Sequence, residues 1–405
     1  MSKMLLENIS VVGPKKIRPE NTILIEDDII SAVFRKSRKK IQAVQSEQEA
    51  SDVKLEDVEK RFSLPDGYYA APGFIDIHTH GAAGRDITDG KKEAWKKISR
   101  FKLSCGTTSY LATIVSSPPE KTKNLCRRLT DYISSGEDPV MLGVHMEGPF
   151  LNPEKKGAQN EKHLREPDLT EVKNWHEILG SYLQIISLAP ELEGSREIIG
   201  YAGQNNIVTG AAHTVANYEQ TRSAFEAGLE LGVHFLNGMK AFHHRDPGVI
   251  GAFLEEKDMP VEIIADGIHL HPATIRMLIN NRDPYSIIAV TDAMRAAGCE
   301  EGTYELGGQS VYIEDGEARL ENGSLAGSTL TMEKTLKNLI SIAGLDISSA
   351  CRLLSKNPAD LLGLGDRGEI AAGKKADIVI LDEELNVEMT VKEGKVVDGN
   401  SNPAY

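Results

Sequence analysis

Eight short apolar segments constrain the fold of this chain more than any other feature. Each is rich in β-branched residues and is followed by a longer segment with apolar residues at helical spacing. Nearly continuous apolar strands that alternate with helices are typical of a parallel sheet, and eight such units predict a closed (β/α)₈ TIM barrel. The segments are FIDIH (74–78), TTSYLATI (107–114), VMLGVHME (140–147), LQIISLAP (183–190), NIVTGAAH (206–213), LGVHFLN (231–237), VEIIADGIH (261–269) and SIIAVTDA (286–293).

The two ends of the chain depart from this pattern. The N-terminal part contains NTILIEDDIISAVF, which alternates like a hairpin, and the C-terminal part contains ADIVILDEELNVEMTVKEGKVVDG, in which EGK is a candidate turn. We predict that residues 1–71 and 367–405 form one small β-sheet or sandwich domain beside a barrel of residues 72–366. Residues 35–61 are almost entirely charged or polar, and we expect a solvated excursion there rather than a recognition element.

Composition excludes several classes of partner. The 405 residues include 46 Lys and Arg against 60 Asp and Glu, a formal net charge of −14, which argues against a general affinity for nucleic acid or anionic membranes. A small anionic substrate stays possible, because a few local cations decide its binding. We find no apolar segment of membrane-spanning length, no apolar core of a signal peptide and no CxxC spacing among the four cysteines. These features predict a cytoplasmic protein with reduced thiols.

Ionisable residues stand at the predicted carboxyl ends of six of the eight segments. In a TIM barrel this rim is where active sites are built. Delivery of such groups from six strands to one rim is hard to explain as packing. The residues are His78, His80, Glu147, His213, His234, His269 and Asp292.

The pair His78 and His80, in PGFIDIHTHG, has the spacing of two ligands for one ion. Strand side chains alternate between faces, so residues two apart point the same way. The alternative is a pair of buried, hydrogen-bonded histidines. The other polar residues of the rim favour the metal site.

Glu147, in VHMEGPF, is a carboxylate at the end of an apolar strand, and it needs either a basic partner or a metal. His145, two residues earlier on the same face, is a candidate supporting partner behind the ligands. Each of His213 and His234 alone would more often be a packed core residue. Together with Glu147, however, they provide two imidazoles and one carboxylate, which is typical of a catalytic zinc site with an open position.

Two further features suggest how a substrate is handled. Asp292, in AVTDAM, leaves the last strand at the barrel mouth, where a carboxylate can act as a general base; its alternative role is a helix N-cap. Arg245, in the basic segment NGMKAFHHRDPG, is a candidate for binding an anionic group, with solvation at the surface as the alternative. The adjacent His243 and His244 diverge, so we do not expect them to share a ligand.

The order of these motifs matches a known family. From about residue 70 to 385, the chain resembles the N-acetylglucosamine-6-phosphate deacetylases of the amidohydrolase superfamily. The resemblance implies hydrolysis of the acetamide of N-acetyl-D-glucosamine 6-phosphate to D-glucosamine 6-phosphate and acetate, in amino-sugar catabolism and recycling. It also implies a divalent metal, zinc or iron, and a homodimer. The motifs are PGFIDIHTHG, HMEGPF, GAAHT, GVHFLNGM, FHHRDPG, ADGIH, TDAM, LAGSTLTM and GKKADIVIL.

The resemblance also assigns residues to roles. It implies that Glu147, His213 and His234 bind the metal and that Asp292 is the catalytic residue. Some family members lack the pair His78 and His80, so its presence here predicts a second ion bridged by Glu147. Among the substrate contacts, the family implies that Arg245 and His269 hold the sugar phosphate. The implied substrate contacts are Ala158, Gln159, Asn237, Gly238, Arg245, Asp266, Gly267, Ile268, His269, Leu325, Ala326 and Gly327.

Some alternatives stay open at this point. Some family members have a histidine where this chain has Gln159, so an amide is the expected group beside the acetyl carbonyl. The galactosamine epimer is a possible substrate, because one hydroxyl depends on loop geometry. A cyclic-amide amidohydrolase is disfavoured, because no lysine ends any of the eight segments to act as a carboxylated bridge. A non-enzymatic barrel is disfavoured because the ligands and the base are all present.

Overall fold

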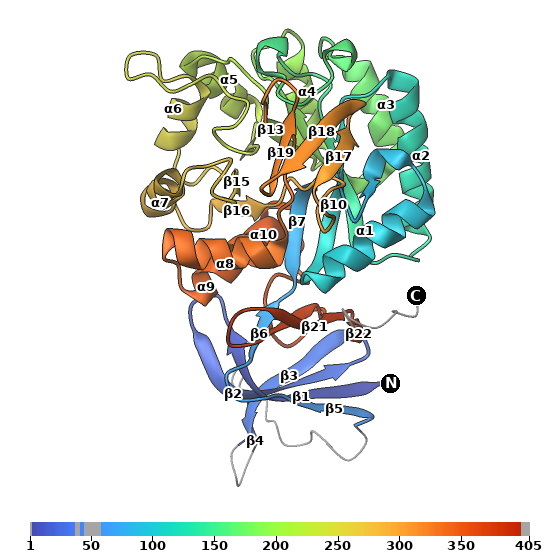
Figure 1. The fold of residues 1–405 in the computed structure, drawn as a ribbon, viewed down its shortest axis with the longest axis vertical. Coiled ribbons are helices and arrows are strands. Elements are labelled where there is room, and N and C mark those ends of the chain that lie inside the picture. Colours follow the sequence, from blue (N-terminus) through green and yellow to red (C-terminus); the bar gives the residue numbers. More distant parts are fainter. Residues whose placement is uncertain (1, 37–40, 44–57, 398–405) are drawn as a thin grey trace.

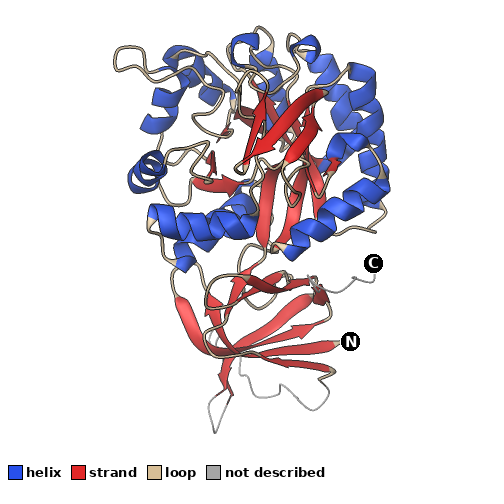
Figure 2. Ribbon diagram, in the orientation of Figure 1, coloured by secondary structure: helices blue, strands red, loops and turns tan. Residues whose placement is uncertain are grey.

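The computed structural model describes residues 2–36, 41–43 and 58–397 of the chain. Figure 1 shows a barrel of alternating strands and helices above a separate sheet that both chain ends build. Figure 2 shows that helices surround the strands of the barrel, whereas the lower part consists of strands and loops.

Eight parallel strands form the barrel sheet, in the order in which they occur along the chain, and the predicted fold class is confirmed. Every residue of β7, β10, β13, β15 and β16 is buried, which explains why these segments are apolar almost without interruption. The strands are β7 (Phe74–Thr79), β10 (Thr107–Val115), β11 (Met141–Glu147), β12 (Leu183–Leu188), β13 (Val208–Ala211), β14 (Leu231–Gly232), β15 (Val261–Ile264) and β16 (Ile287–Val290).

A helix follows each of these strands along the chain, although an insertion precedes the last one. The helices between the strands are α1 (Lys92–Ser104), α2 (Pro119–Ser134), α3 (Leu169–Leu179), α4 (Ser195–Gln204), α5 (Tyr218–Ala227), α6 (Gly248–Glu255) and α7 (Pro272–Asn281). After β16 come α8 (Met332–Ala343), α9 (Ile347–Cys351) and α10 (Asn357–Leu361). No helix of the described residues is long and apolar enough to span a bilayer.

The barrel closes where β7 and β16 end. The backbone N–H of Asp292 donates to the carbonyl of His78 at 2.9 Å, and the N–H of His80 donates to the carbonyl of Ala293 at 2.8 Å. These bonds hold the chain after the last strand against the end of the first strand. They therefore bring together three of the ionisable residues singled out in the sequence.

The last four strands are shorter than the sequence predicts. β14 has two residues and pairs with β15 through a single register pair, Gly232 with Val261. The prediction that four of the rim residues end strands is therefore wrong, because they lie in the loops just beyond. The physical reason is a left-handed backbone at three of them, with φ of 45°, 30° and 48°, which cannot continue a strand ladder. The four residues are His213, His234, His269 and Asp292. The three φ values belong to His213, His234 and Asp292, in that order.

A three-stranded antiparallel sheet, which the sequence did not predict, follows β16. It consists of β17 (Gly302–Leu306), β18 (Gln309–Glu314) and β19 (Glu317–Leu320). The side-chain amide of Gln309 donates to the carbonyl of Ala158 at 2.6 Å, which fixes this sheet to the loop after β11. The sheet therefore borders the carboxyl-terminal mouth of the barrel.

The second large sheet contains both chain ends, as predicted. Its order is β22-β21-β20-β6-β1-β2-β3-β4, with β5 beside β1. The last strand before the barrel, β6, pairs antiparallel with β20 after it. The strands are β1 (Lys3–Val12), β2 (Ile17–Glu26), β3 (Ile29–Lys36), β4 (Ile41–Ala43), β5 (Lys60–Ser63), β6 (Tyr69–Pro72), β20 (Ile378–Leu381), β21 (Val387–Lys392) and β22 (Lys395–Val397).

The excursion predicted at residues 35–61 is wrong in part, because β4 and the ends of β3 and β5 come from it. These ends join the sheet through backbone hydrogen bonds, which do not depend on apolar side chains. Most of the remaining excursion lies outside the described residues. The predicted limits of the two domains stay a prediction. All four cysteines lie in the described part of the chain and are free thiols.

Candidate metal and substrate site

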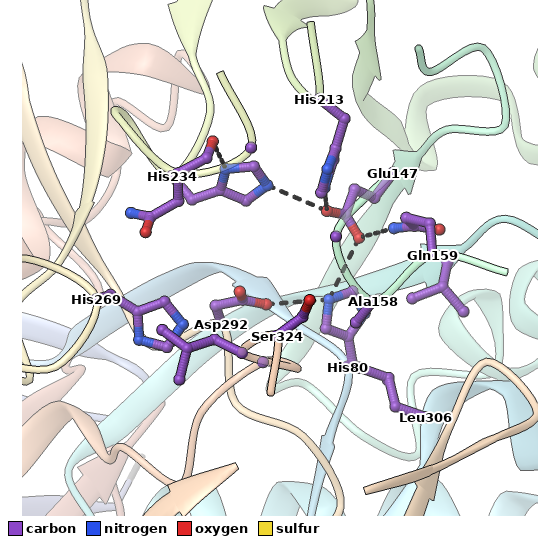
Figure 3. A pocket seen from close by; sticks show the side chains of 16 residues that line it. His80, Glu147, Ala158, Gln159, His213, His234, His269, Asp292, Leu306 and Ser324 are labelled. Atoms are coloured by element: carbon purple, nitrogen blue, oxygen red, sulfur yellow. Dashed lines mark hydrogen bonds and ion pairs between the residues drawn. The ribbon is translucent and has the colours of Figure 1, made fainter. Parts of the chain in front are cut away.

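Glu147 lies at the end of β11 in the middle of a cluster of imidazoles (Figure 3). Its Oε1 atom is 3.1 Å from Nε2 of His213 and 3.3 Å from Nε2 of His234. Its Oε2 atom is 3.4 Å from Nε2 of His80. The two oxygens of one carboxylate therefore face different histidines, which is the arrangement a bridging ligand needs.

His78 and His80 point to the same side, as their spacing predicts. Nε2 of His80 lies 3.0 Å from Oδ1 of Asp292, and Nε2 of His78 lies 3.6 Å from the same oxygen. His78 is fully buried, whereas Asp292 is 8% exposed and reaches the cavity described below. The pair thus forms a second group of donors beside Glu147.

Electrostatics tie these residues together. Burial alone would lower the pKa of His78, but Glu262, Asp292 and Glu147 outweigh it and raise this pKa to about 10. Burial alone would raise the pKa of Asp292, but His78 and His80 lower it to about 2. The buried carboxylates are therefore ionised, and positive charge must lie beside them. Protonated imidazoles or a divalent cation can supply that charge.

The donor groups fit a divalent metal ion. The ligand atoms of Glu147, His213 and His234 lie within 4.8 Å of one another, and so do those of His78, His80 and Glu147. Nε2 of His78 is buried and has no hydrogen-bond partner among the described residues, so an ion could take the place of its proton. Imidazole nitrogen and carboxylate oxygen are ligands of zinc and iron. The residues thus fit one ion and carry donors for a second.

The orientation of His213 and His234 is set by backbone carbonyls. Nδ1 of His213 lies 2.7 Å from the carbonyl of Lys155, and Nδ1 of His234 lies 3.2 Å from the carbonyl of Asn237. A carbonyl only accepts, so Nδ1 carries a proton, and Nε2 is the nitrogen that contacts Glu147 and would bind an ion in place of its own proton. Gly238 permits this packing: a Cβ there would lie 2.8 Å from Nδ1 of His213, and its φ is 61°.

His145 lies behind the candidate ligands, and its hydrogen bonds go to groups other than Glu147. Its Nδ1 faces the carbonyl of Ile77 at 3.0 Å, and its Nε2 faces the hydroxyl of Ser187 at 2.6 Å. Burial and the neighbouring His78 lower its pKa to about 4, so the ring is neutral. The ring packs against that of His78, with centroids 4.6 Å apart. His145 therefore supports the imidazole of His78 by packing.

Glu262, on β15, is a site residue that sequence reasoning missed. It is fully buried, and its Oε2 atom lies 2.9 Å from Nδ1 of His78. The same oxygen accepts the backbone N–H of His234 at 3.0 Å. The available signal was an acidic residue inside the apolar segment VEIIADGIH.

Gln159 faces Glu147. Its Nε2 donates to Oε2 of Glu147 at 2.7 Å, and its Oε1 accepts the backbone N–H of Ser116 at 2.9 Å. The side chain is 5% exposed. One N–H and the carbonyl of this amide are therefore engaged in holding Glu147, which leaves a single N–H for any other group.

A cavity of about 320 Å³ opens beside these residues, in front of Asp292 (Figure 3). Most of the predicted substrate contacts border it. Val115, Gly157, Leu306 and Ser324 also border it and were not predicted; two of them come from β17 and the loop after β19. The full lining is His80, Val115, Glu147, Gly157, Ala158, Gln159, His213, His234, Asn237, Gly238, His269, Asp292, Leu306, Ser324, Leu325 and Gly327.

Several predicted contacts lie away from the cavity wall. Arg245 is exposed in the loop before α6, and its guanidinium contacts the ring of His244 at 2.7 Å. The neighbouring His243 and His244 rings pack together, with centroids 4.4 Å apart. The other predicted contacts outside the lining are Asp266, Gly267, Ile268 and Ala326.

Asp266 positions His269 rather than bordering the cavity. Its Oδ2 atom lies 2.6 Å from Nδ1 of His269, and its Oδ1 atom accepts the backbone N–H groups of Ile268 and His269 at 2.8 Å. Burial would raise the pKa of Asp266, but these bonds to His269 lower it below its ordinary value. The His269 ring is thereby held at the cavity wall.

Comparison with known proteins places this geometry in a family. The amidohydrolase family model matches residues 69–397. The N-acetylglucosamine-6-phosphate deacetylase of Lysinibacillus sphaericus is 35% identical over 331 residues, which cover 82% of this chain and 86% of that protein. The N-acetylgalactosamine-6-phosphate deacetylase of Escherichia coli O157:H7 is also 35% identical, over 82% of this chain and 88% of that protein.

A solved structure agrees with these relatives. It is a variant of N-acetyl-D-glucosamine-6-phosphate deacetylase from Mycobacterium smegmatis, in complex with N-acetyl-D-glucosamine-6-phosphate. Its TM-score to this chain is 0.88, with 29% sequence identity, over 98% of this chain and all of that chain. The similarity thus extends over the barrel and the sheet of the chain ends together.

Proposed function

Since the chain belongs to the amidohydrolase family and, within it, to the N-acetylglucosamine-6-phosphate deacetylases, we propose that its cavity is the site of a metal-dependent deacetylation. The enzyme hydrolyses the acetamide of N-acetyl-D-glucosamine 6-phosphate to D-glucosamine 6-phosphate and acetate. The observation that carries this proposal is the position of Asp292, which borders the cavity beside the cluster of Glu147, His213 and His234.

Glu147, His213 and His234 would hold the metal ion, zinc or iron. His78 and His80, with Glu147 as the bridge, would hold a second one. When bound, a divalent ion supplies positive charge that acidifies the attacking water and polarises the acetyl carbonyl. The open side of the cluster faces the cavity, where the acetamide has access to it.

Asp292 moves the proton in this reaction. Its pKa of about 2 leaves it ionised near neutral pH, so it can accept a proton from the attacking water at a carboxylate oxygen. The water oxygen forms a bond to the carbonyl carbon, and the carbon–nitrogen bond then breaks. The proton passes from Asp292 to the departing amine, which balances the reaction.

Gln159 has a different role from the one its position suggests in the sequence. Because its amide holds Glu147 and the Ser116 backbone, its main contribution is to fix the bridging carboxylate. Its one remaining N–H can still donate to the acetyl oxygen. Ala158, Asn237, Gly238, Leu325 and Gly327 would surround the sugar.

We propose that a second copy of this chain completes the phosphate end of the site. His269 borders the cavity, whereas Arg245 is exposed outside it. We therefore place Arg245 of a partner subunit at the phosphate, in a homodimer. Mixed dimers of Arg245→Ala and Asp292→Asn chains test this. Activity returns in the mixture if the arginine acts across the interface, because one site then has both groups; no recovery contradicts it.

Deacetylation of N-acetylgalactosamine 6-phosphate is a second candidate. It is favoured by the E. coli relative of that name, which is as identical to this chain as the relative from L. sphaericus. The two substrates differ in the orientation of one hydroxyl, which the residues around the sugar would read. A cytoplasmic location is proposed from the four free thiols, which suit a reducing compartment.

The decisive experiment combines metal analysis of the purified protein with acetate release from both 6-phosphate epimers. We expect bound divalent metal and a higher kcat/KM for the glucosamine derivative. A higher value for the galactosamine derivative would favour the second candidate. A metal-loaded protein that releases no acetate from either epimer would refute the proposed function.

A further inference from the structure

Glu262 is a buried carboxylate that the proposed mechanism does not use. Oε2 lies 2.9 Å from Nδ1 of His78 and accepts the backbone N–H of His234 at 3.0 Å. Oε1 is buried and has no hydrogen-bond partner among the described residues. An acid that served only to stabilise the fold would be expected to use both oxygens, because an unsatisfied buried oxygen costs free energy.

The contact with His78 determines which ring nitrogen is available. An ionised carboxylate only accepts, so Nδ1 of His78 carries a proton, and Nε2 is the nitrogen that can exchange its own proton for an ion. Nε2 points to Oε1 of Glu147 at 3.8 Å and to Oδ1 of Asp292 at 3.6 Å, and it has no hydrogen bond among the described residues. Glu262 thus presents His78 as a ligand for an ion beside Glu147.

Glu262 could instead be a metal ligand itself, with His78 and His145. The ligand atoms of these three residues also lie within 4.8 Å of one another. However, His145 has no free lone pair: Nδ1 faces a carbonyl, which requires a donor, and Nε2 lies 2.6 Å from the hydroxyl of Ser187, which then donates. A support for His78 is therefore the better explanation of the buried acid.

The same carboxylate also contacts the other group of ligands. His234 has a left-handed backbone, with φ of 30°, and the bond from its N–H to Glu262 fixes the peptide group at that turn. One side chain therefore touches a ligand ring of the second position and the backbone of a ligand of the first. Its charge acts on the ring, and its hydrogen bond acts on the backbone.

We propose that Glu262 is the positioning residue that makes the His78 and His80 position a metal site, through its charge on the His78 imidazole. This rests on the proposed metal-dependent function. Carboxylates behind a ligand histidine raise its basicity, and their loss lowers metal affinity by about 10- to 100-fold. Loss of the charge should thus weaken the second ion and spare the first.

Glu262→Gln in the full-length protein tests this proposal. Glutamine keeps an oxygen that can accept both hydrogen bonds but removes the charge, so the backbone of His234 stays supported. We expect zinc titration against a competing chelator to show two equivalents per chain in the unaltered protein. In the variant, the first equivalent should bind as before and the second about 10- to 100-fold more weakly. Excess zinc should then restore kcat/KM.

The control is Asp138→Asn, which alters another buried carboxylate, bonded to Ser99 and Tyr132 and away from the cluster. It should bind both equivalents with unaltered affinity. The proposal is overturned if Glu262→Gln binds both equivalents normally, if it loses both equally, or if the unaltered protein binds only one. The titration needs no substrate, so selective loss of the second equivalent in a protein without deacetylase activity would refute the proposed function and support this inference.

Discussion

The two candidate metal positions use similar ligands but hold them in different ways. His213 and His234 lie in loops after short strands, on left-handed backbone, and each is oriented by a neutral backbone carbonyl. His78 lies within β7, on regular strand backbone, and is oriented by the buried carboxylate of Glu262. The first position thus depends on the shape of the backbone, whereas the second depends on a charge.

This difference suggests why the two positions should respond differently to mutation. Strained loop residues persist only when their surroundings fix them, so the first position should be sensitive to packing. The ladder of β7 holds His78, so the second position should tolerate changes in packing there but not the loss of charge. Glu147 borders both positions, and changes in it should not discriminate between the two.

The largest effect is expected from Asp292→Asn. The variant loses the base but keeps a side chain of the same shape, so kcat should fall by about 10²- to 10⁴-fold. The metal held by Glu147, His213 and His234 should be retained, because the ion pairs of Asp292 among the described residues are with His78 and His80. The measurement is kcat alongside metal content. Near-normal turnover with full metal content would contradict the role of Asp292.

The next effect separates the positions directly. His213→Asn should remove the first ion and with it nearly all activity. Loss of a residue that only supports a ligand lowers metal affinity by about 10- to 100-fold, and loss of the ligand itself should lower it further. His80→Asn should remove only the second ion and leave measurable turnover. Both are followed by metal per chain and kcat/KM. Equal losses of metal and activity in the two variants would show that the positions are not independent.

A third test concerns packing at the first position. Gly238→Ala places a Cβ 2.8 Å from Nδ1 of His213, on a backbone with φ of 61°. Displacement of that ring should lower kcat/KM by about 10- to 100-fold. Gly136→Ala is the matched control, since its φ is 68° and nothing lies within 4 Å of the added Cβ. It shares the backbone strain, about 1–2 kcal/mol, without the contact. A similar loss of activity in both variants would attribute the effect to strain.

The barrel and much of the cluster could be predicted from sequence for a physical reason. Strands buried on both faces must be apolar, so a polar residue at the end of such a strand stands out, as Glu147 does at the end of β11. The sheet β17–β19 gave no such signal, because exposed and buried residues alternate along β18. Its turn pairs, Gly307 with Gly308 and Asp315 with Gly316, were the available evidence.

Other features depend on contacts that sequence spacing does not show. Glu262 meets His78 across 184 residues, and only the closure of the barrel brings them together. The side of the barrel on which Arg245 lies depends on the path of one loop. The left-handed turns at His213 and His234, which end the strand ladders early, are not determined by residue types alone.

The smallest expected effect comes from Gln159→Leu, which tests whether the amide serves the second position more than the first. The amide donates to Oε2 of Glu147, the oxygen that faces His80 and not His213. Without this bond, Oε2 is less well fixed, and the affinity for the second ion should fall by up to about 10-fold, while the first is retained. Zinc titration measures both affinities.

The change also leaves the backbone N–H of Ser116 without its acceptor, at a cost of about 1–3 kcal/mol. Unfolding by denaturant is therefore measured in parallel. Loss of stability with unaltered affinity for both ions would show that Gln159 only supports the loop. A loss of kcat with both ions bound would show that its remaining N–H acts on the acetyl oxygen.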